Sequence, residues 1–274
     1  MLLAARSVGS MDDASRERLR QMFSDGAIDY ERSRPGYPER LFADLAGIAE
    51  LTPVSRVLEL GCGTGQATAG LARLGVGVTA LDLSPEMAAA AARNVAAFPK
   101  VVVTAGAFED WPLPDEPFDV VFAATAFHWL DPAVRMRKSA DALRPGGFLA
   151  IAGIRQVAGG SSEFFDAAVR LYAGLGLKTA QFKPPPPAEA LPRDASEFAE
   201  CGLFERPVFF RYEWSQAYTA SELIALLATF SEFRALSGTD QGGLVTSLQA
   251  ELDRRGLQEI EMRYLAQLAA APRL

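Results

Sequence analysis

The most informative part of the chain is the ten-residue stretch Val57-Leu58-Glu59-Leu60-Gly61-Cys62-Gly63-Thr64-Gly65-Gln66. Its first four residues predict a short buried strand, and the residues from Gln66 onward predict a helix. The three glycines therefore form the turn between the two elements. Glycines at alternate positions let a backbone pass close to a ligand and direct amide groups toward it. The stretch predicts a ligand-binding strand–turn–helix unit.

The surrounding sequence predicts an α/β protein with a mainly parallel sheet. Short apolar runs alternate with helical patterns rich in Ala and Leu, which is typical of βαβ units. Strands are expected over residues 56–60, 76–82, 101–105, 118–124, 148–154, 206–214 and 259–268. Helices are expected over residues 38–50, 66–74, 85–97, 132–143, 163–175, 220–230 and 243–255. Gly146 and Gly147 are expected to stop the fourth helix before the fifth strand.

The composition narrows the class of function. A net charge of −7 opposes a broad phosphate-binding surface, so no nucleic acid partner is expected. The only histidine, His128, and two distant cysteines, Cys62 and Cys201, offer no metal-ligand spacing, so no metal is expected. Unclustered cysteines fit a reducing compartment and predict a cytoplasmic protein. The apolar runs are far shorter than the roughly 20 residues that cross a bilayer, so no membrane partner is expected.

The glycine spacing indicates the cofactor class. A nicotinamide-binding turn needs G-x-G-x-x-G, and the third glycine of that motif would fall on Gln66. The observed G-x-G-x-G, with Glu59 two residues before Gly61, instead resembles the first motif of class I S-adenosylmethionine-dependent methyltransferases. Asp82 at the end of the second strand, the turn at 106–112, the stretch at 123–131 and the Leu-Arg-Pro-Gly-Gly turn at 143–147 also match that family. The segment at 30–38 resembles the lead-in of the trans-aconitate methyltransferase-like (type 11) group.

The resemblance implies a Rossmann-like fold with a seven-stranded, mostly parallel sheet and helices on both faces. It also implies an antiparallel seventh strand. We expect one methyltransferase domain over residues 1–274, with an N-terminal lid segment at 1–37 and a cofactor-binding core at 38–155. Residues 156–274 are expected to supply substrate-shaping helical insertions and the last strands.

The resemblance further implies S-adenosylmethionine as cofactor and S-adenosylhomocysteine as product. Asp82 is expected to accept hydrogen bonds from the ribose hydroxyls, and Glu59 to hold either the glycine loop or the methionine amino group. The backbone amide of Phe108 is expected at the adenine, where many members have an acidic residue and this chain has Ala107. Arg34, on the lid, is expected to pair with the methionine carboxylate or an acidic acceptor. The expected cofactor-binding residues are Tyr30, Arg34, Glu59, Gly61, Cys62, Gly63, Thr64, Gly65, Asp82, Leu83, Met87, Ala107, Phe108 and Ala124.

Methyl transfer depends mainly on positioning, because the lone pair of the acceptor must lie in line behind the methyl group. His128 follows the fourth strand and is the candidate catalytic residue, either as a base or as an orienting group; the alternative is a structural residue under the lid. We expect methylation of a small-molecule acceptor at a carboxylate or hydroxyl oxygen. The alternatives are an S-adenosylmethionine sensor or scaffold, an N- or C-methyltransferase, a protein acceptor and a nicotinamide oxidoreductase. The acceptor and the oligomeric state stay open at this point.

Overall fold

The computed structural model of the protein describes residues 35–174, 185–228, 233 and 236–274. Its strands are β1 Arg56–Leu60, β2 Gly77–Asp82, β3 Val101–Ala105, β4 Phe118–Ala124, β5 Leu143–Val157, β6 Val208–Thr219 and β7 Glu259–Pro272. Its helices are α3 Glu39–Ile48, α4 Gln66–Ala72, α5 Pro85–Asn94, α6 Arg135–Ala142, α7 Ser162–Gly174, α8 Ser196–Cys201, α9 Ala220–Ala228 and α11 Gly238–Arg255. Two 3₁₀ turns are η1 Phe127–Trp129 and η3 Ala188–Ala190.

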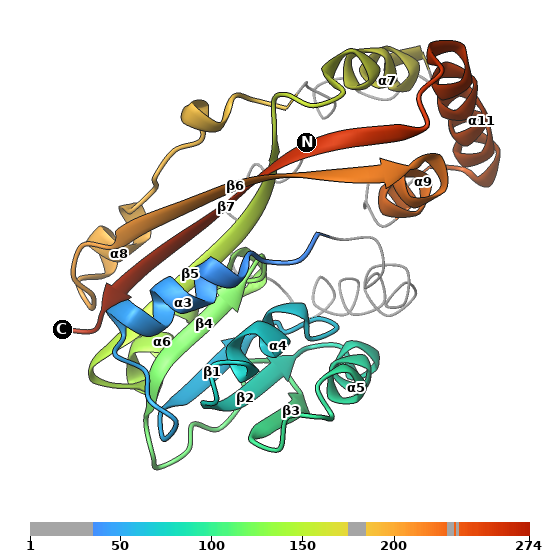
Figure 1. The fold of residues 1–274 in the computed structure, drawn as a ribbon. Coiled ribbons are helices and arrows are strands. Elements are labelled where there is room, and N and C mark those ends of the chain that lie inside the picture. Colours follow the sequence, from blue (N-terminus) through green and yellow to red (C-terminus); the bar gives the residue numbers. More distant parts are fainter. Residues whose placement is uncertain (1–34, 175–184, 229–232, 234–235) are drawn as a thin grey trace.

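The strands form one seven-stranded sheet in the order β3-β2-β1-β4-β5-β7-β6 (Figure 1). Strands β1 to β5 are parallel, and β7 pairs antiparallel with both β5 and β6. The order reverses between β1 and β4, which lie side by side. Such a switch point opens a crevice for ligands beyond the carboxyl ends of the strands. The α/β fold class, the seven strands and the antiparallel seventh strand are confirmed.

Helices cover both faces of the sheet. Leu41 and Leu45 of α3 and Leu71 of α4 are fully buried against one face. Met136 of α6 and Phe198 of α8 pack on the opposite face. Because both faces are covered, the parallel strands need apolar side chains in both directions, which explains their nearly continuous hydrophobic runs.

The strands β5, β6 and β7 continue beyond the parallel part of the sheet. Their far ends, with α7, α9 and α11, enclose a further apolar cluster, which we call the cap cluster (Figure 1). Phe164 of α7, Leu223 of α9 and Leu248 of α11 are fully buried there against Ile260 of β7. The predicted helical insertions between the fifth and seventh strands are thus present.

The start of β5 differs from the prediction. The strand begins at Leu143, which pairs with Phe118, and the register then shifts before the pair Val120 and Phe148. The Arg-Pro-Gly-Gly segment is therefore a bulge within the strand, where we expected a stop between helix and strand. A Cβ on Gly147 would lie only 3.0 Å from the carbonyl oxygens of Arg144 and Asp119, so this close approach requires glycine.

Candidate active site at the carboxyl ends of β1, β2 and β4

The glycine loop joins β1 to α4 in a conformation that only glycine adopts readily. Gly61, Gly63 and Gly65 have φ angles of +68°, +56° and +90°. A Cβ on Gly61 would lie 2.5 Å from the Cβ of Ala126, and one on Gly65 would lie 3.2 Å from the Cα of Ala91. A Cβ on Gly63 would meet no atom within 4 Å. The loop is thus packed from behind at its two ends and open at its middle glycine.

The carboxylate of Asp82 holds this loop from the end of β2. Its Oδ2 accepts a hydrogen bond from the backbone N–H of Gly63 at 2.8 Å, and its Oδ1 accepts one from the N–H of Ser84 at 2.9 Å. The hydroxyl of Ser84 caps α5 by accepting from the N–H of Met87 at 3.2 Å. Burial raises the pKa of Asp82, and the two amides oppose that effect. A carboxylate has about four acceptor positions, so Asp82 can still bind ligand hydroxyls.

The side chain of Glu59 lies under the loop and is 1% exposed. Among the described residues, neither of its carboxylate oxygens has a hydrogen-bond partner. Burial raises its pKa to about 8; the neighbouring hydroxyl of Thr68 opposes this effect, and the negative charge of Asp82 adds to it. The hydroxyls of Thr64 and Thr68 are likewise buried, and neither has a partner at hydrogen-bonding geometry in the described part of the chain. A buried polar group without a partner costs about 1–3 kcal/mol, so this arrangement fits a ligand that supplies a donor.

The turn after β3 is tied to the turn after β4. The carboxylate of Glu109 accepts a hydrogen bond from the N–H of Asp131 at 2.8 Å. Lys138 of α6 donates to the carbonyl oxygen of Glu109 at 2.8 Å. Beside it the side chain of Phe108 is buried, and Ala107 is half-buried. Glu109 therefore braces the two turns against each other.

The chain leaves β4 through a sharply turned residue, Thr125. Its φ of +55° is unfavourable for a β-branched side chain. Its hydroxyl lies 2.6 Å from the hydroxyl of Tyr37, which precedes α3, and its N–H donates to Ala152 of β5 at 2.8 Å. Strained backbone of this kind occurs preferentially at functional sites. The turn places Ala126 against Gly61 and leads into η1 with His128.

His128 is half-buried in η1, and its ring centre lies 4.8 Å from that of Trp129. Its Nε2 is buried without a hydrogen-bond partner in the described part of the chain. Burial lowers its pKa to about 4, and the positive charges of Arg155 on β5 and Arg135 on α6 contribute. At neutral pH the imidazole is therefore uncharged and can accept a proton or a hydrogen bond.

Comparison with known proteins connects this geometry to a family. Residues 58–151 match a family model described as a methyltransferase domain. Over these residues the chain is similar to a methyltransferase domain. The match extends from β1 into β5 and includes the glycine loop, Asp82 and the His128 turn.

Two mycobacterial relatives extend the similarity. An uncharacterized methyltransferase of Mycobacterium tuberculosis is 39% identical over 137 residues, which cover 50% of this chain and 54% of the relative. The trans-aconitate 2-methyltransferase of Mycobacterium tuberculosis is 37% identical over 142 residues, 50% of each chain. The chain thus spans about half the length of the curated relatives that it matches.

Solved structures share the fold of this chain. A chain from Anaeromyxobacter dehalogenans, provisionally described as a type II methyltransferase, is 27% identical with a TM-score of 0.56. That similarity covers 87% of this chain and 97% of the other. A Haemonchus contortus phosphoethanolamine N-methyltransferase, solved with phosphomonomethylethanolamine and S-adenosylhomocysteine, is 20% identical with a TM-score of 0.51, covering 99% of this chain and 60% of the other. The latter likeness establishes the fold alone.

Most of the residues predicted for the site lie together in the structure. Glu59, the glycine loop with Cys62 and Thr64, Asp82 with Leu83, and Ala124 all lie at the carboxyl ends of β1, β2 and β4. Met87 is buried in the first turn of α5. Tyr30 and Arg34 lie outside the described residues. The thiol of Cys62 is buried, which raises its pKa and fits a packing role.

Three residues at this site, Tyr37, Arg135 and Arg155, were not predicted from the sequence. Arg155 carried a weak signal, because a cation at the end of a buried strand is unusual. The contact between Tyr37 and Thr125 joins residues 88 positions apart and leaves no local pattern. The described residues contain no group of three potential metal ligands. None of their helices has the length and apolar character needed to cross a membrane.

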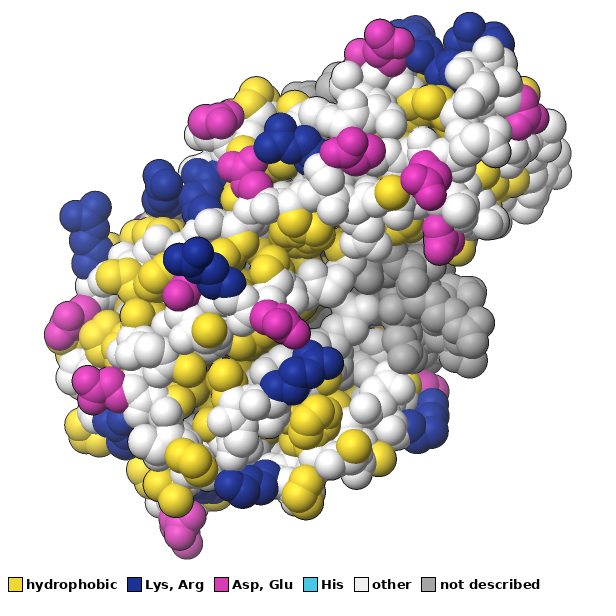
Figure 2. Space-filling model, in the orientation of Figure 1, with side chains coloured by type: hydrophobic (Ala, Val, Ile, Leu, Met, Phe, Trp, Pro, Cys, Tyr) yellow, Lys and Arg dark blue, Asp and Glu magenta, His cyan; other side chains and the backbone are white. Residues whose placement is uncertain are grey.

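The surface of the protein carries charges of both signs. On the face shown in Figure 2, Lys and Arg side chains are interspersed with Asp and Glu, and apolar side chains gather between them. An open groove of about 880 Å³ lies between α3 and β6. In it the hydroxyl of Tyr212 donates to Asp44 at 2.7 Å, and Arg40 lies 3.5 Å from the same carboxylate oxygen.

Proposed function

We propose that this protein is an S-adenosylmethionine-dependent methyltransferase that acts on a small-molecule acceptor, at a carboxylate or hydroxyl oxygen. The observation that carries the proposal is the buried carboxylate of Glu59, which lacks a hydrogen-bond partner beside the glycine loop and Asp82. An ammonium group would satisfy Glu59, and ribose hydroxyls would satisfy the remaining acceptor positions of Asp82. The methyltransferase domain and its relatives support the same cofactor class.

The residues of the site would divide the work of binding. Asp82 would hold the ribose, Glu59 the amino group, and the amide of Phe108 the adenine. The open position at Gly63 lets the backbone approach the ligand closely. Bound S-adenosylmethionine supplies a methyl group on a positively charged sulfur. Ala124 and the Thr125 turn would lie beside the reacting centre, with His128 on the acceptor side.

His128 would act as an uncharged imidazole. With a hydroxyl acceptor, its Nε2 would take the proton that the acceptor loses on methylation. With a carboxylate acceptor no proton has to move, and His128 would only orient the acceptor, either by donating from Nε2 in the tautomer that carries its proton there or through a bridging water. The positive charge of Arg155, which acts electrostatically on His128, favours an anionic acceptor. The trans-aconitate methyltransferase among the relatives supports a carboxylate acceptor as well.

Calorimetric titration with S-adenosylhomocysteine tests the cofactor site. We expect Asp82→Ala to weaken binding by about 1.5–3 kcal/mol, or roughly 10- to 100-fold, because a charge-assisted hydrogen bond is lost. The control is Asp115→Asn, at an exposed aspartate on the turn before β4 at the opposite edge of the sheet. A folded Asp82→Ala variant with unchanged affinity would rule out the ribose contact. Absence of binding by the wild-type protein would refute the proposed function.

A further inference from the structure

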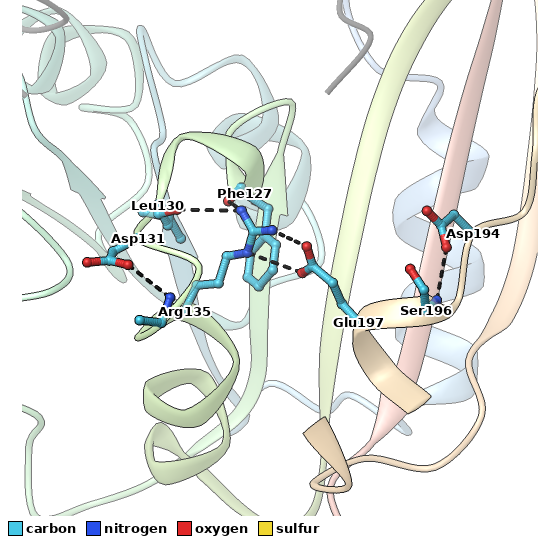
Figure 3. Close-up of polar contacts among 8 residues, drawn as sticks. Phe127, Leu130, Asp131, Arg135, Asp194, Ser196 and Glu197 are labelled. Atoms are coloured by element: carbon cyan, nitrogen blue, oxygen red, sulfur yellow. Dashed lines mark hydrogen bonds and ion pairs between the residues drawn. The ribbon is translucent and has the colours of Figure 1, made fainter. Parts of the chain in front are cut away.

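The turn that carries His128 is held by the side chain of Arg135 (Figure 3). The Nη1 of Arg135 donates to the carbonyl oxygen of Phe127 at 3.2 Å and to that of Leu130 at 3.5 Å. Its guanidinium carbon also lies 5.2 Å from the centre of the Phe127 ring. Phe127 and Leu130 flank His128 in the chain. Arg135 therefore contacts the backbone on both sides of the imidazole-bearing residue.

The stability of α6 does not explain why an arginine stands here. Arg135 is the first residue of α6, where the helix dipole disfavours a cation. Its side chain is only 12% exposed, and burying an arginine is costly unless its charge is paired. Glu197 of α8 supplies the pairing. The Nε of Arg135 donates to Oε2 of Glu197 at 3.1 Å, and its Nη2 donates to Oε1. A two-point contact of this kind fixes the plane of the guanidinium.

Glu197 lies in the first turn of α8, which precedes β6 in the chain. At the start of α8, the carboxylate of Asp194 accepts a hydrogen bond from the N–H of Ser196 at 2.9 Å (Figure 3). The next side chain, Phe198, is buried in the same apolar cluster as Phe127. The α8 segment thus presents Glu197 to Arg135 from a packed position. A chain of contacts runs from this segment to the His128 turn.

We propose that Arg135 and Glu197 form a positioning pair for the methyl-transfer site, through which α8 and the residues just before it (194–201) set the place of His128 relative to the acceptor. The inference rests on the proposed function, which defines the acceptor side. Arg135 and Glu197 are positioning residues, because they act on the acceptor side through the backbone of the His128 turn.

The test uses the imidazole of His128, which gives a single histidine signal in NMR spectra because the chain has one histidine. The charged groups that act on it are Arg155 from β5 and Arg135 from α6. Arg135→Lys keeps the charge but loses the two-point contact and the fork that reaches both carbonyls. We expect the turn to open to water and the pKa of His128 to rise by one unit or more, a tenfold or larger gain in proton affinity.

A second variant and a matched control complete the experiment. Glu197→Gln removes the negative partner, and that loss of charge alone would lower the pKa of His128 further. The rise that we expect in this variant therefore reports opening of the turn to water, and the double variant should add little to either single change. Glu213→Gln breaks a chemically similar pair with Arg263, 2.8 Å apart on the antiparallel strands β6 and β7, and should leave the signal of His128 unchanged. Folded Arg135→Lys or Glu197→Gln protein with the wild-type titration of His128 would overturn the positioning role.

Failure of this inference can be distinguished from failure of the proposed function. Affinity for S-adenosylhomocysteine should stay within about threefold of the wild type in both variants, because the hydrogen bonds of the pair go to each other and to the His128 turn and not to Glu59 or Asp82. Loss of that affinity in the positioning variants would assign the pair to the cofactor site and overturn the inference. Once an acceptor is identified, the kcat of Arg135→Lys and of Glu197→Gln should each fall by about tenfold or more with little change in KM. An unchanged kcat in both variants would also overturn the inference.

Discussion

Glu59 is the residue whose environment depends most on a ligand. Its carboxyl group is fully buried and has no hydrogen-bond partner among the described residues, so its charged form is disfavoured. The pKa of about 8 in the folded protein compares with an ordinary value of 4.5. The neutral form of Glu59 therefore makes its full contribution to the free energy of unfolding below pH 4.5, and this contribution is lost as the pH rises through 8. An arriving ammonium group would reverse the preference and favour the carboxylate.

Binding of S-adenosylhomocysteine should therefore release a proton from Glu59. At pH 7 we expect about one proton per ligand, because the carboxyl group is mostly neutral before binding and ionised beside the ammonium afterwards. The measurement is the binding enthalpy in two buffers with different enthalpies of ionisation. Glu59→Gln should lose the proton release and also flatten the fall in urea stability between about pH 4.5 and pH 8. Equal proton release by both proteins would contradict the assignment of the amino group to Glu59.

At the scale of elements, the contact between α3 and α4 depends on a missing side chain. A Cβ on Gly70 of α4 would overlap the ring of Phe42 from α3. That ring cannot move aside freely, because it is buried and its centre lies 6.2 Å from that of Phe122 and 6.4 Å from that of Tyr37. The close approach brings α4, and with it the end of the glycine loop, against the sheet.

Gly70→Ala should accordingly destabilise the protein by about 1–3 kcal/mol, the usual cost of overpacking a core, despite the higher helix propensity of alanine. The matched control is Gly47→Ala in α3, where an added Cβ meets no atom within 4 Å. This change should stabilise the protein by about 0.5–1 kcal/mol. Denaturant unfolding of both variants measures the difference. A stabilising effect of Gly70→Ala would show that the two helices can separate at little cost.

At the scale of the whole molecule, three large apolar clusters support different tasks. Two lie on the faces of the sheet under the glycine loop and the His128 turn, and the cap cluster lies at the far ends of β5 to β7. Cofactor binding by Glu59 and Asp82 should therefore be insensitive to damage in the cap cluster.

We expect Leu248→Ala in α11 to destabilise the cap cluster by about 2–5 kcal/mol, since Leu248 is fully buried. Affinity for S-adenosylhomocysteine should stay within about threefold of the wild type. Leu58→Ala in β1, equally buried but adjacent to Glu59, should cost similar stability and also weaken binding. Hydrogen exchange locates the loss of protection, and calorimetry gives the affinity. Equal loss of binding in both variants would show that the cap is part of the cofactor site.

Much of the molecule could be predicted because its signals are local. The β1–loop–α4 unit follows from consecutive residues whose burial, turn conformation and helix start are encoded side by side. Asp82 could be placed because parallel strands end at the same edge of a sheet. The start of β5 was predicted five residues too late, since a Pro-Gly-Gly bulge within a strand looks locally like a stop between elements.

The acceptor side of the site depended on contacts between distant residues. Arg135 and Glu197 are 62 positions apart, and Tyr37 and Thr125 are 88 apart. No pattern within a segment encodes such pairs, because each partner alone resembles an ordinary surface arginine, glutamate, tyrosine or threonine. The glycine loop could therefore be predicted from the sequence alone, because the glycine spacing and the apolar run of β1 are local features. The burial of Glu59 without a partner, the uncharged state of His128 and the position of its turn arise only when the packed fold removes water and brings distant charges together.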